Sequence, residues 1–316
     1  MNANQLAAFA AVCDEGSIRA GARALNLSAS SITRSLHELE EEALTQLFRR
    51  TTSGVTVTER GQPLLVYAQR VGAGMKLAKE EIRLMRGESQ KRIAVAVTPW
   101  ITMTVLPAAV SRFRRCMPDV TVEFVEGLRA VANPLLRQER LDFFVGWDEQ
   151  DGSNPDLTFR PILRTGAAIT VRKGHPLRAC QSLAELLDLE WLIPIDPPSQ
   201  GGIMYRLFEK YNLPFPARVH PIHSFTYALG LIPETDMAGV FPWPLIEASA
   251  MRNLLCAVPL REQMDDHVYG VISPAGYPLG APARQFAECL IEALHAAVSS
   301  SDPEIRRVMS SVEMLV

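Results

Sequence analysis

The chain has 316 residues, of which 47% are hydrophobic and 21% charged. A chain of this length typically folds into about two domains, and this composition excludes collagen, an extended coiled coil and intrinsic disorder. The 32 basic and 35 acidic residues give a net charge of −3, so the whole molecule exerts no attraction on nucleic acid or on an acidic membrane. Any binding to such a partner has to be local.

The five cysteines lie far apart, at the positions Cys13, Cys116, Cys180, Cys256 and Cys289. This spacing predicts neither a disulfide framework nor a zinc site, and no metal or cofactor is expected. The chain begins without a signal-peptide pattern, and it has no apolar segment near the length of about 18 residues that crosses a bilayer. We therefore expect a cytoplasmic protein with no membrane partner.

Residues 1–58 have the pattern of short helices followed by a hairpin. Ser17 is a predicted N-cap for a second helix over residues 18–27, and Ser28 for a third that points Ile32, Leu36 and Leu39 inward. The stretch after residue 48 alternates polar and apolar side chains around a glycine, as a β-hairpin does. The segment is therefore interpreted as a helix-turn-helix with a wing.

The spacing alone leaves two functions open for this segment. A small helical domain without any nucleic-acid role is the plainer alternative, since short helix pairs are common. Residues 1–58 hold five arginines and six acidic residues, so DNA binding requires Arg34, Arg49 and Arg50 to lie on a face that excludes the acidic residues 38–42.

Residues 59–89 are predicted to form a long helix whose apolar side chains recur at steps of four and three, the spacing of a coiled-coil seam. We call these residues the seam: Leu64, Ala68, Val71, Met75, Ala78, Ile82 and Met85. An amphipathic helix packed on its own domain is the alternative interpretation. The length of the pattern favours a linker helix that pairs two chains.

From residue 90 to residue 301, short apolar strands alternate with helical segments. Strands at residues 93–97, 120–125 and 142–146, separated by helices at 103–116 and 131–140, predict a parallel β-α-β-α-β unit. A second set of such segments near residues 167–212 includes a helix opened by the pair Ser182 and Glu185, and it predicts a second, similar lobe. Residues 302–316 form a tail with a short helix.

Two segments are candidates for binding an anion, because each precedes a helix at the carboxyl end of a strand, where backbone N–H groups point outward. The first comprises residues 98–102 and contains Trp100 as an aromatic wall, and the second comprises residues 199–202. Two ordinary strand-to-helix turns are the plainer alternative. An enzyme or a solute-binding protein remains a rival class, but neither explains residues 1–86, and no nucleophile elbow, P-loop or metalloprotease motif is present.

These residues resemble the LysR-type transcriptional regulators over nearly the whole chain. The landmarks that carry the resemblance are Leu6, Phe9, Gly16, Ser17, Ile18, Ala22, Leu25, Ser28, Thr33, Arg34, Leu39, Glu40, Leu47, Phe48, Arg50, Val57, Thr58 and Gly61, followed by Leu106, Pro107, Pro118, Asp119, Val120, Leu141, Asp142, His175, Pro176 and Leu177. The chain departs from the family pattern at Ala29, where a glutamine is common, and at Ala43 with Leu44, which replace a Leu-Gly turn.

The resemblance implies an α+β architecture in four parts. Residues 1–58 form a winged helix-turn-helix, residues 59–89 a dimerising linker helix, residues 90–301 a two-lobed α/β effector domain similar to periplasmic solute-binding proteins, and residues 302–316 a tail. The implied function is a sequence-specific DNA-binding regulator, not an enzyme, that responds to a small organic anion. The first lobe looks closest to the branch that responds to aromatic sulfonates and carboxylates.

The resemblance also assigns residues and partners. The residues implied for DNA binding are Ser28, Ser30, Ser31, Thr33, Arg34, Arg50 and Thr52, because short hydroxyl side chains let a helix enter the major groove. The residues predicted for effector binding come instead from the two strand-to-helix segments and from a later helix start and strand end: Thr98, Trp100, Ile101, Thr102, Ser199, Gly201, Gly202, Ser224, Phe225 and Phe241. The implied partners are a double-stranded DNA operator, the anion, a second copy through the linker helix, a homotetramer and RNA polymerase.

Overall fold

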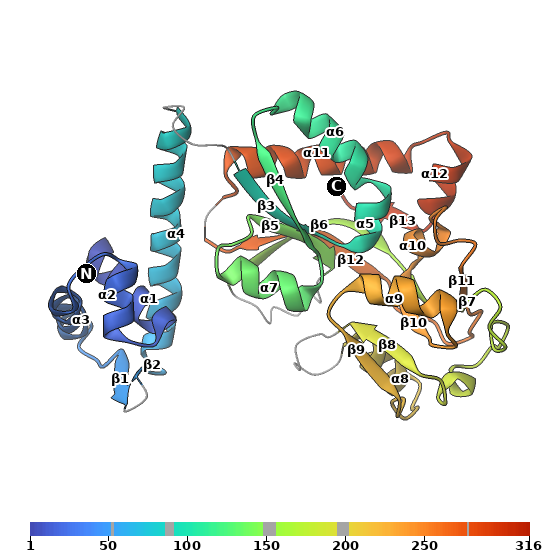
Figure 1. The fold of residues 1–316 in the computed structure, drawn as a ribbon, viewed down its shortest axis with the longest axis horizontal. Coiled ribbons are helices and arrows are strands. Elements are labelled where there is room, and N and C mark those ends of the chain that lie inside the picture. The colour runs from blue at the N-terminus through green and yellow to red at the C-terminus, as the bar shows by residue number, and fades with distance from the viewer. Residues whose placement is uncertain (52–53, 86–91, 148–155, 195–201, 277) are drawn as a thin grey trace. The chain divides into compact units, whose positions relative to one another are not determined.

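The computed structural model describes residues 1–51, 54–85, 92–147, 156–194, 202–276 and 278–316 (Figure 1). The chain divides into two compact units, one of Met1–Ser89 with Ala275–Pro278 and one of Gln90–Pro274 with Leu279–Val316. Among the helices in the described ranges, none combines the length and the apolar character that a bilayer crossing requires.

Three helices form the core of the first unit: α1 (Ala3–Glu15), α2 (Ile18–Ala24) and α3 (Ala29–Ala43). Ser17 and Ser28 accept hydrogen bonds from backbone N–H groups of α2 and α3, so both predicted N-caps are confirmed. Ile32, Leu36 and Leu39 are buried along one side of α3, as their spacing predicted. The polar side chains of α3 are left on its outer face.

A two-stranded hairpin and a long helix complete this unit. Strand β1 (Phe48–Thr51) pairs antiparallel with β2 (Gly54–Val57), and helix α4 (Gly61–Met85) follows. Figure 1 shows α4 running beside α1, and Leu65 and Ala68 of α4 belong to the same buried cluster as Phe9. The hairpin is the wing that the alternating pattern predicted.

The seam residues of α4 divide into two groups. Leu64 and Ala68 pack on the core of their own unit, as the alternative interpretation of the helix requires. Val71, Met75 and Ile82 are instead 39%, 45% and 50% exposed, and Ala78 is exposed as well. The side chain of Met85 lies outside the described part of the structure. The second group leaves a row of apolar side chains that this chain itself does not cover.

In the second unit, the first lobe is built on a six-stranded sheet with the order β13-β6-β12-β5-β3-β4. Its strands are β3 (Arg92–Val97), β4 (Thr121–Glu126), β5 (Phe143–Trp147), β6 (Leu157–Thr165), β12 (His267–Pro274) and β13 (Val312–Met314). Strand β3 pairs parallel with β4 and β5, which confirms the predicted parallel unit, while β6, β12 and β13 pair antiparallel.

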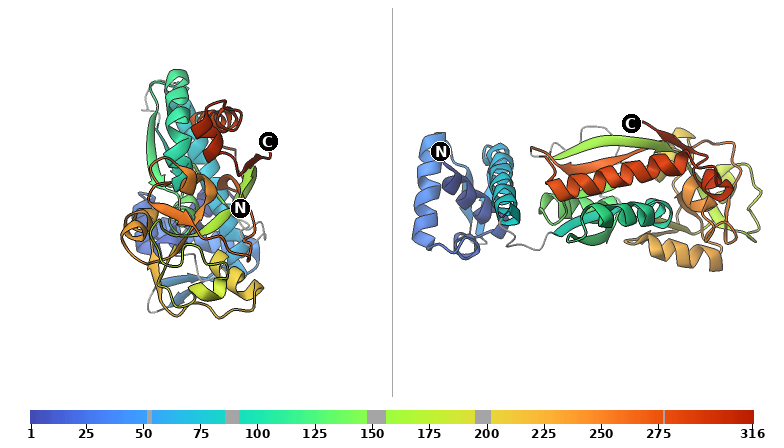
Figure 2. Two further views of the ribbon diagram at one scale, coloured as in Figure 1. Left: turned by 90° about the vertical axis from the view of Figure 1, so that its right-hand side faces the viewer. Right: turned by 90° about the horizontal axis from the view of Figure 1, so that it is seen from above.

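The alternation of side chains along β3 explains why helices cover both faces of this sheet. Val95 packs in a cluster with Phe113 of α6 (Leu106–Cys116) and Phe286 of α11 (Ala281–Val298). Ala96, on the opposite face, packs with Leu136 of α7 (Arg129–Arg137). Helices α6 and α11 therefore lie side by side on one face, as Figure 2 shows from above.

The second lobe contains two smaller sheets. The three-stranded sheet has the order β10-β7-β11, and in the other sheet β8 and β9 pair in parallel. The elements of this lobe are β7 (Ala167–Arg172), η1 (Leu183–Leu186), β8 (Trp191–Pro194), α8 (Ile203–Lys210), β9 (Val219–Ile222), α9 (Phe225–Leu231), η2 (Ile232–Glu234), β10 (Gly239–Pro242), α10 (Trp243–Glu247) and β11 (Leu255–Ala257). Trp191 and Phe208 meet edge to face in its core.

The structure corrects two details of the predicted lobes. The helix expected over residues 103–116 is preceded by a separate helix, α5 (Pro99–Thr104), because Pro99 is suited to the first turn of a helix and starts it directly after Thr98. The second lobe does not repeat the first: β7 pairs only antiparallel, and Ser182 caps a short 3₁₀ turn by accepting from the N–H of Ala184.

The tail is an integral part of the second unit. Helix α12 (Pro303–Val308) is followed by β13, which adds an antiparallel edge to β6. Met309 and Val312 are buried in the same cluster as the first-lobe sheet. The tail therefore contributes to packing, and the short helix predicted for it is confirmed.

Leu44 lowers the stability of the first unit. It ends α3 in the left-handed conformation, with φ of 51°, and its side chain is 91% exposed. That conformation costs a residue with a Cβ about 1–2 kcal/mol, which exceeds the entropy of about 0.5–1 kcal/mol that glycine adds to the unfolded chain. Leu44→Gly is therefore expected to slow hydrogen exchange of the α3 amides about threefold to fivefold. Leu44→Ala keeps the Cβ and is the control, and equal exchange in the two variants would contradict this explanation.

Candidate functional site

The outer face of α3 carries four of the residues predicted to bind DNA. The hydroxyl of Ser28 lies 2.9 Å from that of Ser30 and 2.8 Å from that of Ser31, and Thr33 donates to the carbonyl of Ala29 at 2.8 Å. These bonds hold the short side chains close to the helix. A helix whose polar side chains are short and held close to its backbone can approach a DNA groove closely.

Arg34 projects from this face and is 83% exposed on its side chain. Its Nε donates to a carboxylate oxygen of Glu38 at 2.9 Å, and this bond, together with a weaker one from Gln5, lowers the pKa of Glu38. The acidic residues are therefore only partly kept away from the arginines. Glu40 is turned inward by comparison and accepts the backbone N–H of Leu47 at 2.7 Å.

A shallow hollow of about 840 Å³ joins α3 to the wing. It is lined by Ser30, Thr33, Arg34, His37, Glu40, Gln46, Phe48 and Arg49. Arg50 belongs to β1, but its side chain lies outside the described part of the structure, as does Thr52. Arg49, one of the three arginines that DNA binding requires on one face, lies on this surface with Arg34, although it was not among the residues implied for DNA binding.

The second unit contains a cavity of about 550 Å³ between its two lobes, within the range of about 300–1,000 Å³ that is usual for small-molecule sites. The first lobe contributes Thr98, Pro99, Trp100, Gly127, Leu128, Arg129, Phe144, Trp147, His267 and Tyr269. The second lobe contributes Ala167, Ile193, Pro194, Gly202, Met204, Tyr205, Phe215, Val219, Pro221, Phe225, Val240, Pro242 and Leu245. Most of these side chains are apolar.

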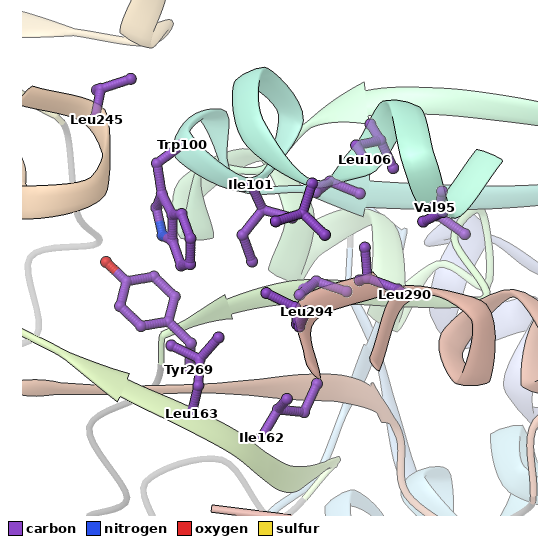
Figure 3. Close-up of a cluster of buried hydrophobic side chains, with 14 of the residues drawn as sticks. Val95, Trp100, Ile101, Leu106, Ile162, Leu163, Leu245, Tyr269, Leu290 and Leu294 are labelled. Carbon is purple, nitrogen blue, oxygen red and sulfur yellow. The ribbon is translucent and has the colours of Figure 1, made fainter. Parts of the chain in front are cut away.

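Trp100 and Tyr269 form one corner of this cavity. Their rings are 5.6 Å apart and nearly perpendicular, with Leu245 of the second lobe beside them (Figure 3). Burial raises the pKa of Tyr269 far above its ordinary value, and the nearby Trp100 indole N–H lowers it only in part. The indole N–H is buried and faces Tyr269.

Arg129 brings a positive charge to the cavity wall. It is the first residue of α7, and its guanidinium lies 4.6 Å from the centre of the Trp147 ring. His267 contacts the same indole, with 5.3 Å between the ring centres. Among the described residues that line the cavity, Arg129 is the only one with a permanent charge. Stacking on Trp147 fixes the position of this charge.

The second lobe supplies an aromatic wall. Tyr205 of α8 stacks on Phe215 with ring centres 3.8 Å apart and planes only 3° from parallel. Phe225 reaches the cavity from the start of α9 and meets Phe241 edge to face at 5.0 Å. Both walls therefore carry aromatic rings, and the charge of Arg129 lies on the first lobe.

Four of the residues predicted for effector binding line the cavity: Thr98, Trp100, Gly202 and Phe225. Ile101 and Phe241 point instead into the apolar core, and Thr102 is exposed and donates to the carbonyl of Thr98. The Ser224 hydroxyl donates to Glu126 and does not line the cavity. Ser199 and Gly201 lie outside the described residues.

Sequence reasoning missed Arg129, Trp147, Tyr205 and Tyr269. A signal for Arg129 was present, because β4 neighbours β3 in parallel, so the residues that follow the two strands come to the same sheet edge. Tyr269 had no comparable signal, since β12 enters this sheet after a long excursion through the second lobe.

Both units match known protein families. Residues 3–62 match the bacterial regulatory helix-turn-helix protein, lysR family, and residues 86–295 match the LysR substrate binding domain. The chain is 26% identical over 293 residues to the HTH-type transcriptional regulator YbhD of Escherichia coli, covering 91% of this chain and 90% of that protein. It is 25% identical over 313 residues to the HTH-type transcriptional regulator GbpR of Azospirillum brasilense, covering 95% and 87%.

Solved full-length structures share this fold. ArgP from Mycobacterium tuberculosis superposes with a TM-score of 0.65 at 17% identity, covering 93% of this chain and 97% of that one. A full-length OxyR variant from Pseudomonas aeruginosa superposes with a TM-score of 0.59 at 16% identity, covering 92% and 94%. The α+β architecture inferred from the sequence is thereby confirmed. The chain belongs to the LysR family of DNA-binding transcriptional regulators, with a helix-turn-helix unit and a substrate-binding unit.

Proposed function

We propose that this regulator is controlled by a small aromatic monoanion, a carboxylate or a sulfonate, bound in the cavity between the two lobes. The observation that carries the proposal is the composition of the cavity wall, which is mostly apolar and holds one permanent charge, on Arg129, among its described residues. An apolar cavity favours a ligand with a flat hydrocarbon part, and a fixed cation in such surroundings selects an anionic group.

The distribution of groups along the wall supports an aromatic ligand. The stacked pair of Tyr205 and Phe215 offers a flat apolar surface for a ring. On the first lobe, Thr98 is an N-cap whose hydroxyl makes no capping bond and is able to donate to an acid group. A ligand held by both lobes favours one arrangement of them, which is how binding changes the output of the regulator.

For DNA binding, we propose that α3 enters the major groove and that the wing contacts the backbone. Arg34 is the guanidinium on the outer face of α3, and a forked contact to guanine is worth about 1–3 kcal/mol. Breaking the ion pair between Arg34 and Glu38 costs little free energy, since exposed pairs with this i,i+4 spacing contribute about 0.3–0.5 kcal/mol. Arg49 and Arg50 of β1 supply phosphate contacts.

For assembly, we propose that two chains pair through α4, with the exposed seam residues Val71, Met75, Ala78 and Ile82 at the contact. In a coiled coil, a second helix buries such a row of apolar side chains. Among the described residues, none outside α4 lies within 4 Å of the point where a Cβ of Gly72 or Gly74 would lie. Two glycines in the helix allow a partner helix to approach closely. We extend the proposal to a homotetramer that acts on RNA polymerase in the cytoplasm, where the DNA is.

The anion proposal is tested by calorimetry of the full chain with benzoate, benzenesulfonate and the neutral benzyl alcohol. Arg129→Gln is expected to weaken binding of both anions tenfold or more, since a charge-assisted hydrogen bond contributes about 1.5–3 kcal/mol, and to leave the alcohol unchanged. Arg137→Gln, at the exposed far end of α7, is the control. Binding of the anions that is indifferent to Arg129 would refute this site.

The DNA proposal is tested by fluorescence anisotropy with the DNA upstream of the chain's own gene and with a shuffled duplex. Arg34→Ala is expected to lose about 1–3 kcal/mol on the upstream DNA only, whereas Arg50→Ala weakens binding to both duplexes and flattens the salt dependence by about one unit of slope. Glu38→Gln releases Arg34 and is expected not to weaken binding. An equal loss on both duplexes for Arg34→Ala would rule out base reading by this residue.

The assembly proposal is tested by sedimentation of the full chain. Val71→Glu places a carboxylate in the apolar contact, where it has no partner, and it is expected to raise the dimer dissociation constant at least tenfold. Val71→Leu keeps the position apolar and is the control. If Val71→Glu sediments like the parent chain, the contact lies elsewhere.

A further inference from the structure

A single carboxylate joins the two lobes beside the cavity. Glu126 is the last residue of β4, in the first lobe, and its side chain reaches the start of α9, in the second lobe. One carboxylate oxygen accepts the hydroxyl of Ser224 at 2.5 Å, and the other accepts the backbone N–H of Phe225 at 2.5 Å. Both oxygens are therefore used by donors that lie about a hundred residues further along the chain.

This contact is more than the chain needs to begin α9. Ser224 already caps the helix by accepting the N–H of Thr226 at 3.2 Å, and that bond stays within the second lobe. Glu126 adds a charge-assisted pair of bonds from the other lobe, and bonds to an ionised acceptor are about twice as strong as neutral ones. Its effect is to fix the position of α9 relative to the first-lobe sheet.

Both ends of this contact continue into the cavity wall. Gly127, Leu128 and Arg129 follow Glu126 directly and line the cavity, and Phe225 lines it from the other side of the contact. A shift of α9 is therefore transmitted to the residues next to Glu126.

The chain at Gly127 cannot absorb such a shift by itself. Its N–H donates to the carbonyl of Val97 at 2.9 Å, and a Cβ at this position would lie 2.6 Å from the N of Thr98. The backbone on the Glu126 side of the contact is therefore held against the end of β3, where Thr98 begins the cavity wall. A displacement at the Glu126 contact therefore also displaces the cavity wall.

We propose that Glu126 is a clasp that holds the two lobes together in the absence of a ligand and so sets how far the cavity is closed before the effector enters. The clasp deepens the proposed function, on which its regulatory meaning rests. Because the lobes are already held, effector binding adds to a closed arrangement instead of creating it. A weaker clasp shifts the ligand-free population toward open lobes.

The test is hydrogen–deuterium exchange of the full chain without any ligand. Glu126→Gln keeps the shape of the side chain but removes the charge and one acceptor oxygen. We expect at least tenfold faster exchange at the amide of Phe225 and, in addition, faster exchange in the cavity segments of both lobes, residues 127–129 and 219–222. Glu123→Gln is the matched control, because Glu123 lies on the same strand and pairs with Arg92 at the surface.

Two results would overturn the clasp. Exchange that changes only at Phe225 and Thr226 would show that Glu126 is a cap for α9 alone, and exchange that does not change anywhere would show that the contact holds nothing. Ser224→Ala keeps the charge of Glu126 and removes one donor together with the cap on Thr226. For this variant the deciding result is therefore faster exchange at residues 127–129 of the first lobe, which loss of the cap alone does not produce, and it is available even where Glu126→Gln fails to fold.

No ligand is present in this measurement, so its result does not depend on whether the cavity binds an anion. A second arm titrates benzoate into the parent chain and into Glu126→Gln. If exchange responds as expected but benzoate fails to bind the parent chain, the clasp stands and the proposed effector class falls. If benzoate binds the parent chain and exchange does not respond, the proposed effector class stands and the clasp falls.

Discussion

The cavity depends on the way the chain crosses between the two lobes. Strand β6 belongs to the first lobe and β7 to the second, with only Gly166 between them, and β12 returns to the first-lobe sheet beside β6. A Cβ at Gly166 would lie 2.9 Å from a carboxylate oxygen of Asp266, the residue just before β12, so the two crossings run close together. The lobes are thus joined at a narrow connection, and the space between them is left to contacts such as that of Glu126.

Three features border the cavity between the lobes and determine which ligand fits it. The buried cluster of the first lobe continues through Trp100 into Leu245 of α10, so apolar packing draws the lobes together at one corner of the cavity. At the start of α9, the carboxylate of Glu126 joins them by hydrogen bonds. The charge of Arg129 remains on the wall beside these contacts, held over Trp147. We infer that a bound ligand lies near the apolar corner, the Glu126 contact and the Arg129 charge. The charge and shape of the ligand then influence the arrangement of the lobes.

The sequence predicted the parts of the fold that depend on local patterns. The caps Ser17 and Ser28, the buried side of α3 and the parallel strands all follow from hydrogen bonding and periodicity within short segments. The cavity residues that were predicted, Thr98, Trp100, Gly202 and Phe225, all lie at the start of a helix, where a local pattern indicates them. Tyr269 reaches the cavity through the pairing of β12 with distant strands, and the donors at the start of α9 are taken by Glu126, which no local pattern indicates. Long-range pairing is what one sequence alone cannot supply.

The central claim, that the cavity binds an aromatic anion with its acid group at Arg129, is tested most directly by crystallography with a bromine-labelled ligand. Crystals of the full chain grown with 4-bromobenzoate give an anomalous signal at the bromine. The account predicts a peak beside the rings of Tyr205 and Phe215, with the carboxylate of the ligand at the Arg129 guanidinium. A carboxylate directed away from Arg129, or bromine peaks found only outside the cavity, would contradict it.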